Sequence, residues 1–411
     1  MKALNNMKTS QWLKLLFVST LLAMVTACKV TVSTDDDDEE HHDYVVLEVK
    51  LDGKQEVPMV MTDAWGWGEI KVDIEDNMVK GMIDTYDIDA TAAHIHLGFA
   101  GENGGVAVAL DMSSDKAGMW VVPDTMLSDE EIDMILDGGA YINVHTEAHP
   151  SGEIRGQILP YGVEIEPVNL SGMQEVPAVD TDASAHAWLT IDYDWQIVYL
   201  NVMTMGIDDA TMAHVHEGFA GSNGSAAITL SQNPDNPDHW WAEFDFDDVD
   251  WDMFEMGGYY INVHTSTVGS GELRGQIALE DAHVLITELS GDQEVPAVTT
   301  DASGVAALTV YENADGTGEF VLNVMTDITD ASSAHIHKAE AGANGDVVIG
   351  LLQDAVDLGM FNLTGTFTAD QMMDLQNDMF YINVHSTTHA GGELRGQLIT
   401  SDDDEMDDMP Q

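Results

Sequence analysis

The sequence predicts an all-β protein built from three tandem β-sandwich domains, each with one short helix. Three motifs recur in the same order along the 411 residues. The first, Gln-Glu-Val-Pro, begins at Gln55, Gln174 and Gln293, two equal intervals of 119 residues. This interval exceeds the roughly 20–50 residues of solenoid repeats and suits an independent domain. Between the motifs lie short segments in which apolar and polar residues alternate, as in half-buried strands.

The repeats also set the expected domain limits. We expect the three domains, called modules 1, 2 and 3, to span residues 44–160, 161–279 and 280–400. The flanking parts are an N-terminal segment, an acidic linker and an acidic tail, at residues 1–28, 29–43 and 401–411.

The N-terminal segment has the pattern of an export signal. Three lysines precede the apolar residues 15–25, a run too short to span a bilayer as a helix. The segment ends in Val-Thr-Ala-Cys at Cys28, which resembles a bacterial lipoprotein lipidation site and is the only cysteine of the chain. This resemblance implies a lipid on Cys28, and Lys29 after it favours an outer-membrane anchor. A plain secretory signal is the alternative. We therefore expect a cell-envelope protein on the periplasmic or surface face, without an internal disulfide.

The charge of the chain limits its partners. Thirteen basic residues oppose 74 acidic ones, which gives a formal net charge of −61. Such a surface repels nucleic acid and anionic headgroups, so we expect no nucleic-acid partner and a membrane association that depends on the lipid. Adaptation to salt explains the charge better than specific calcium binding, since no loop has calcium-ligand spacing. The acidic run in residues 35–40 is typical of an extended tether.

Each module opens with strand-like segments. In module 1 these are residues 44–51 and 65–74, with equivalents at 185–191 and 304–311. Residues 313–316, Asn-Ala-Asp-Gly, predict a hairpin turn.

One helix per module interrupts the strands. Ser128 followed by three acidic residues is a capping-box pattern, and Thr368 with Gln371 repeats it. The version in module 2, at residues 247–256, has a weaker cap.

Histidines mark the second and third motifs of every module. A His-x-His pair lies in the second motif, and the third begins with Tyr-Ile-Asn-Val-His. Side chains on a strand alternate faces, so His94 and His96 point the same way, as do Asn143 and His145. The repeated histidines are His94, His96, His145, His214, His216, His264, His335, His337 and His385.

Three imidazoles can hold zinc or copper and leave one coordination position open. We therefore predict one copper or zinc site per module. The surrounding polar residues are expected to be Asn143, Glu153, Arg155, Asn262, Glu272, Arg274, Asn383, Glu393 and Arg395. The alternative is a structural cluster in which these polar groups satisfy one another and fix strand register.

The motifs together resemble the CHRD domain, named after chordin and also found in bacterial proteins. Gln-Glu-Val-Pro, His-Ile/Val-His with Ala-Gly-x-Asn-Gly, Asn-Val-His and Gly-Glu-Ile/Leu-Arg-Gly-Gln recur in three copies that cover residues 44–400. The resemblance implies an extracellular, immunoglobulin-like β-sandwich related distantly to copper-zinc superoxide dismutases. It implies no settled activity, and the role of chordin as a secreted growth-factor antagonist does not transfer to a lipoprotein.

The dismutase likeness suggests an alternative function. Ala213–Phe219 resembles the copper-ligand strand of those enzymes, and Gly392–Gly396 resembles their active-site arginine segment. This implies a metal-dependent oxidoreductase in which Arg155, Arg274 and Arg395 steer an anion. However, the chain lacks a clear bridging imidazole, a zinc loop and a disulfide, and its charge repels superoxide. The leading expectation is thus a non-enzymatic binding or adhesion protein with an unidentified envelope or extracellular ligand.

Overall fold

The computed structural model describes residues 33–34 and 43–400. The expected targeting segment with Cys28, most of the expected linker and the acidic tail lie outside the described residues. Within the described residues, no helix is both long and apolar enough to cross a membrane.

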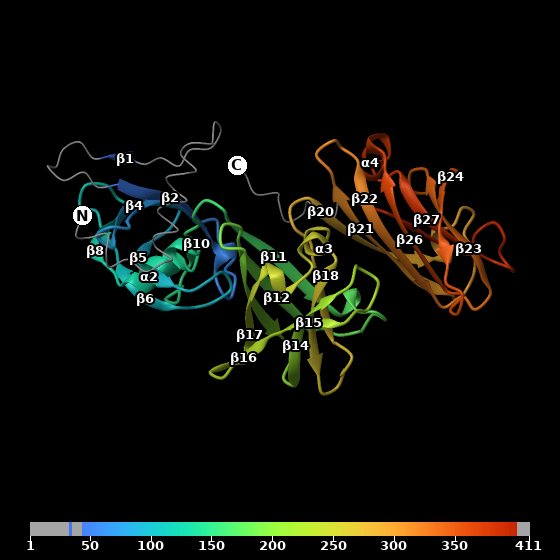
Figure 1. Ribbon diagram of the computed structural model, residues 1–411, viewed down its shortest axis with the longest axis horizontal. Helices are drawn as coiled ribbons and strands as arrows, with labels where there is room; N and C mark the ends of the chain where they lie inside the picture. The colour runs from blue at the N-terminus through green and yellow to red at the C-terminus, as the bar shows by residue number, and fades with distance from the viewer. Residues whose placement is uncertain (1–32, 35–42, 401–411) are drawn as a thin grey trace. The chain divides into compact units, whose positions relative to one another are not determined.

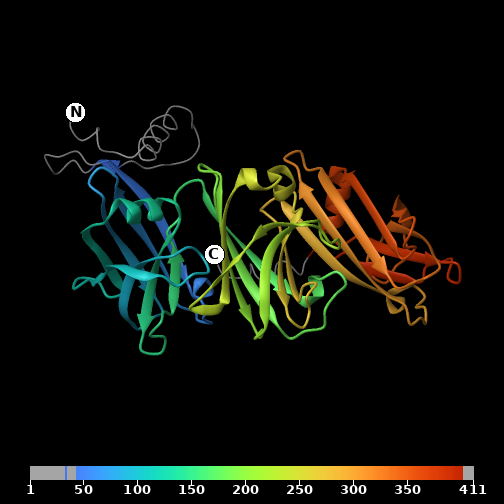
Figure 2. The ribbon, with the colours of Figure 1, turned by 60° about the horizontal axis from the view of Figure 1, so that its bottom comes forward.

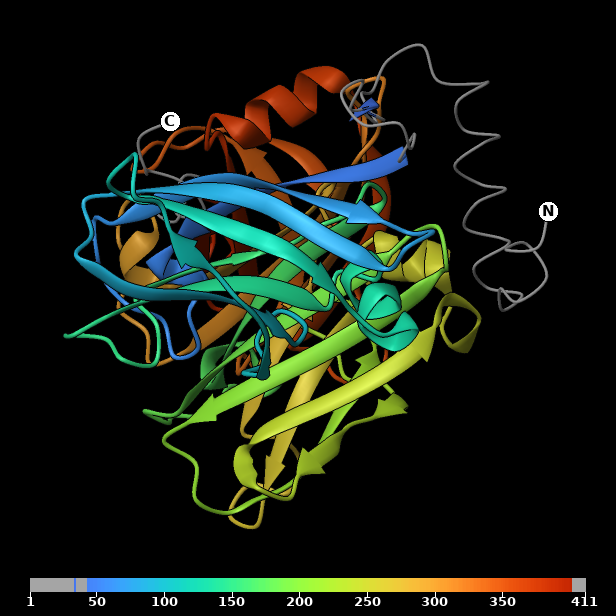
Figure 3. The same ribbon diagram turned by 90° about the vertical axis from the view of Figure 1, so that its left-hand side faces the viewer.

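Module 1 forms one antiparallel sheet in the order β6-β5-β9-β10-β2-β3-β4-β8-β7, and β1 (Ser33–Thr34) pairs with β2. Its strands are β2 (Asp43–Asp52), β3 (Trp65–Asp73), β4 (Met78–Tyr86), β5 (Ala90–Leu97), β6 (Gly105–Ala109), β7 (Asp111–Met112), β8 (Met119–Met126), β9 (Ala140–Thr146) and β10 (Ile154–Gln157). Its helical elements are the 3-10 turn η2 (Gly53–Gln55) and helix α2 (Asp129–Leu136). Figure 3 shows the twist of the long strands, drawn in blue and teal.

Modules 2 and 3 repeat this topology with nine strands each. Module 2 contains β11 (Val163–Ser171), η3 (Gly172–Gln174), β12 (Ser184–Asp192), β13 (Ile197–Met205), β14 (Ala210–Glu217), β15 (Ala226–Thr229), β16 (Ser231–Asn233), β17 (Asn236–Asp245), η4 (Phe246–Asp248), α3 (Trp251–Glu255), β18 (Tyr259–Thr265) and β19 (Leu273–Ile277). Module 3 contains β20 (Ala282–Ser290), η5 (Gly291–Gln293), β21 (Ser303–Glu312), β22 (Gly318–Thr326), β23 (Ala331–Lys338), β24 (Asp346–Gly350), β25 (Leu352–Gln353), β26 (Met360–Phe367), α4 (Ala369–Gln376), β27 (Phe380–Ser386) and β28 (Leu394–Gln397). Figure 1 colours them from green to red.

Each sheet folds over on itself, so that its two halves enclose a core in a nearly barrel-like sandwich (Figure 2). In module 1 the halves join where β10 pairs with β2, at Arg155 opposite Asp52. Inward residues such as Ile70 of β3 and Ile95 of β5 belong to one buried cluster. The alternation read from the sequence therefore produces this core, and the predicted all-β sandwich class is confirmed.

The three predicted helices are present. Ser128 caps α2 in a capping box with Glu131, and Thr368 does the same for α4 with Gln371. In module 2 the weakly capped segment gives the 3-10 turn η4 and then a five-residue helix, α3, capped by Asp250.

The chain divides into two compact units. The first carries the sheet of module 1. The second carries the sheets of modules 2 and 3 together with the segment Gly98–Gly104.

Candidate metal centre

The histidines of each module meet on one face of two adjacent strands. In module 1, β5 supplies His94 and His96, and β9 supplies His145. The two strands pair so that His94 lies opposite Asn143 and His145 lies opposite Ala92. The intervening Ile95 and Val144 are fully buried on the other face, which directs the imidazoles away from the core.

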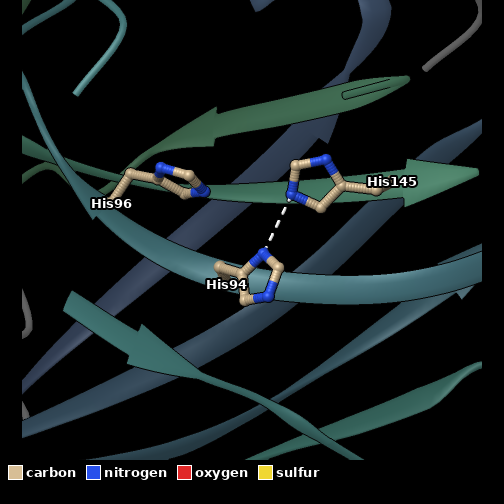
Figure 4. A group of neighbouring side chains, drawn as sticks. All are labelled: His94, His96 and His145. Atoms are coloured by element: carbon tan, nitrogen blue, oxygen red, sulfur yellow. Dashed lines mark hydrogen bonds between the residues drawn. The ribbon is translucent and has the colours of Figure 1, made fainter. Parts of the chain in front are cut away.

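The imidazoles are close enough to share one ion. In every module, one ligand nitrogen from each histidine lies within 4.8 Å of the others. Figure 4 shows the three rings of module 1 converging, with His94 Nδ1 3.0 Å from His145 Nε2. Ring centroids are 4.9–5.9 Å apart in this group. Two nitrogens bound to one zinc at about 2.0–2.1 Å lie roughly 3–4 Å apart, so small ring rotations suffice for coordination.

Hydrogen bonds to backbone carbonyls orient two rings of the triad in module 2. His216 Nδ1 lies 3.1 Å from the Gly224 carbonyl, and His264 Nδ1 lies 3.2 Å from the Gly269 carbonyl. A carbonyl only accepts, so Nδ1 carries the proton and Nε2 presents its lone pair. His337 with Gly345 and His385 with Ala390 repeat these contacts in module 3.

The inward nitrogens are buried without hydrogen-bond partners in modules 2 and 3. They are Nδ1 of His214 and His335 and Nε2 of His216, His264, His337 and His385. Buried polar atoms in native proteins nearly always have a partner, and a cation could serve as the common partner of these three nitrogens. The donor set therefore fits copper or zinc, with Nδ1 from the first histidine and Nε2 from the other two.

Burial also favours the neutral form of these imidazoles. It is the main cause that lowers the pKa of His94, His214 and His335 below 6.5, and a neighbouring histidine adds to it. The pKa values of His145, His264 and His385 are lowered by burial and by the other two histidines of each triad. Neutral imidazole is the metal-binding form, so these lowered pKa values are compatible with metal binding near neutral pH.

A tyrosine and an arginine support the second histidine. In module 2 the rings of His216 and Tyr260 are stacked 5.1 Å apart, and the Arg274 guanidinium lies 3.6 Å from the centre of the Tyr260 ring. Arg274 donates to the carbonyls of Ser222 at 2.8 Å and Phe219 at 3.1 Å. It thereby fastens the loop after His-x-His. The same rings stack in the other modules, where Arg155 and Arg395 lie over their tyrosines.

These arginines are only 1–2 % exposed. Their placement gives no support to anion steering, the role that the dismutase likeness implies. Each instead fixes backbone around the histidines or lies against the tyrosine beneath them.

A buried glutamate that sequence reasoning did not select lies beside each arginine. Glu56 accepts from Asn143 at 3.3 Å, Glu175 from Asn262 at 3.3 Å and Glu294 from Asn383 at 2.9 Å. Burial raises the pKa of Glu56 and of Glu175 to about 7, against the lowering effect of Arg155 and Arg274. The signal was present in the threefold Gln-Glu-Val-Pro motif, from which we inferred only the repeats and the family resemblance.

The glutamates that we predicted from the sequence to surround the histidines accept hydrogen bonds from threonine hydroxyls. Glu272 accepts from Thr181 at 2.8 Å and Thr265 at 2.7 Å, Glu153 accepts from Thr62 and Thr146, and Glu393 accepts from Thr300. They therefore tie turns together, and Glu393 also pairs with His389 at 3.2 Å.

Comparison with known proteins identifies the repeated unit. The model of the CHRD domain family matches residues 47–158, 167–277 and 285–398, and every match contains one histidine triad. The chain belongs to the CHRD domain family. Chordin from Danio rerio is 37% identical over 93 residues, which cover 20% of this chain and 10% of that protein. Chordin from Xenopus laevis is 29% identical over 192 residues, or 42% and 20% of the two chains. The chain thus spans a fifth or less of these relatives, and the likeness concerns CHRD modules, not whole proteins.

Proposed function

We propose that each CHRD module binds one copper or zinc ion through its three histidines, and that the chain is a lipid-anchored, non-enzymatic binding or adhesion protein of the cell envelope. The supporting observation is the set of buried, unpartnered imidazole nitrogens that face one another in modules 2 and 3. The alternative of a self-satisfied polar cluster does not account for these nitrogens.

The residues of the chain divide the work at this site. The three imidazoles supply the ligand atoms, the carbonyls of Gly224 and Gly269 set the tautomers, and Arg274 holds the loop. When bound, an ion with three protein ligands offers one further position to an oxygen or nitrogen of a partner. Adhesion through that position is compatible with a three-module chain, since three weak contacts in one molecule strengthen one another.

Zinc stoichiometry tests the proposal. The purified chain is dialysed against zinc in a citrate buffer, which competes with the weak carboxylate sites of the acidic surface, and its metal content is then measured. We expect close to three equivalents for the wild type and close to two for His214→Ala/His216→Ala. The control is His283→Ala, an exposed histidine outside the triads, which should keep three. Equal zinc content in the double variant and the wild type would contradict the proposal, provided that circular dichroism shows both folded.

A further inference from the structure

Three exposed aromatic side chains gather on the outer face of the module 1 sheet. Trp65 and Trp67 of β3 are 47% and 41% exposed, and Tyr86 of β4 is 41% exposed. Gly66 and Gly68, which alternate with the tryptophans, are buried and face inward, where there is little room. A Cβ on Gly68 would lie 2.2 Å from the Ile83 side chain. The Trp-Gly-Trp-Gly segment therefore places its large residues outward and lets the strands pack closely behind them.

The aromatic rings occupy adjacent rows of the sheet. Trp65 lies directly opposite Tyr86, and their rings are stacked with centroids 4.2 Å apart. Trp67 lies in the next row, opposite Asp84. Three neighbouring exposed aromatic residues form a contiguous apolar patch. Such patches mark binding sites more often than single scattered apolar residues do.

Charged groups of both signs surround the rings. On β2, Asp52 lies opposite Trp65 and Lys50 lies opposite Trp67. Lys116 binds Asp84 at 2.6 Å, beside Trp67 in the same row. The face thus offers carboxylate acceptors and ammonium donors next to aromatic surface.

The combination occurs only in module 1 among the three sheets. At the positions of Trp65 and Trp67, module 2 has Ser184 and His186, and module 3 has Ser303 and Val305. Six of the 13 basic residues also belong to module 1, namely Lys50, Lys54, Lys71, Lys80, Lys116 and Arg155. Since the repeat preserves the framework, this difference at one face indicates a separate use.

A second copy of the chain is a poor occupant. In module 3 the same face receives a loop of its own unit, because Asn323 donates to the Ala220 carbonyl at 2.9 Å. Module 1 has Met82 at the position of Asn323 and cannot make this bond. In addition, the equivalent loop of module 3, which a second copy would present to this face, has Glu340 where the loop of module 2 has Phe219.

We infer that this face of module 1 binds a neutral polysaccharide. The C–H face of a pyranose ring packs on an indole ring, and its hydroxyls both donate to carboxylates and accept from ammonium groups. An apolar protein surface would instead strip water from Lys50, Asp52 and Asp84 without replacing their hydrogen bonds. An anionic polymer would be repelled by a chain with net charge −61.

Affinity electrophoresis in native gels tests the inference. The full chain is run in gels containing laminarin, xyloglucan, galactomannan or hydroxyethylcellulose, and in a gel containing anionic alginate. We expect at least one neutral polymer to slow the wild type, and Trp65→Ala/Trp67→Ala to weaken that binding about tenfold or more. The matched control is Trp195→Ala/Trp241→Ala in module 2, where the tryptophans are 38% and 44% exposed. This control should bind as the wild type does.

Several results would overturn the inference. They are the absence of retardation by every neutral polymer, retardation by alginate alone, and equal weakening in the control variant. Self-association in sedimentation that the Trp65→Ala/Trp67→Ala variant abolishes would assign the face to a second copy instead. Both variants remove exposed side chains, and circular dichroism verifies that they are folded.

Discussion

Replacing the buried glutamate of module 1 by glutamine should stabilise that module at alkaline pH. Glu56 is 4% exposed, and burial raises its pKa from 4.5 to about 7 even though Arg155 is nearby. The folded state therefore holds the proton more tightly than the unfolded state does. The stability that protonated Glu56 contributes is complete below pH 4.5 and is lost as the pH rises through 7.

The size of the effect follows from the two pKa values. At about 1.4 kcal/mol per pH unit, the difference between 4.5 and about 7 corresponds to roughly 3 kcal/mol. Glutamine keeps an amide that can bond Asn143 but carries no charge to bury. At pH 9 we expect Glu56→Gln to raise the free energy of unfolding of module 1 by about 3 kcal/mol, whereas at pH 4 the two proteins should be similar.

The assay must resolve the modules, because a chain with several domains does not unfold in one step. Hydrogen exchange across a urea series, read on peptides of β3 and β9, reports module 1 separately. Exposed Glu48→Gln is the control for the change in net charge and should leave the pH dependence as it is. If Glu56→Gln destabilises module 1 at pH 9, the carboxylate is ionised and paired with Arg155, and the reasoning is wrong.

Three further predictions concern other parts of the chain. Burial and neighbouring imidazoles lower the pKa of His214 and His264, so with free zinc buffered well above its dissociation constant half of the zinc should be released below pH 6.5. An indicator titration with a midpoint above that value would count against the site. Arg274→Met leaves the carbonyls of Ser222 and Phe219 without their donor, and at about 1–3 kcal/mol for each lost bond hydrogen exchange should show module 2 destabilised by about 3 kcal/mol. A loss below about 1 kcal/mol would be inconsistent with this role. Cys28→Ser should move the expressed protein from the detergent phase to the aqueous phase in Triton X-114 partitioning, and unchanged partitioning would rule out the lipid anchor.

Local patterns were sufficient for the fold class and for the grouping of the histidines. Period-two alternation fixed which face His94 and His96 share, and threefold recurrence pointed to His145 as their companion. Capping residues located α2 and α4 for the same reason, since a cap is a local hydrogen bond. Whether the triads bind metal stays a prediction.

Long-range contacts were beyond the reach of these patterns. The sheet closes where Arg155 of β10 pairs with Asp52 of β2, and no local sequence pattern predicts that pairing. Glu56 is separated by 87 residues from Asn143, and its burial depends on the packing of both segments. An acidic residue beside a turn is ordinarily exposed, so its sequence context suggested the opposite environment.

X-ray absorption at the zinc edge of the loaded chain tests the central claim most directly, because it distinguishes the triads from the many surface carboxylates. Our account predicts three nitrogens at about 2.0–2.1 Å with the multiple scattering of imidazole, plus one light atom. A first shell made of oxygens alone, without imidazole scattering, would contradict it.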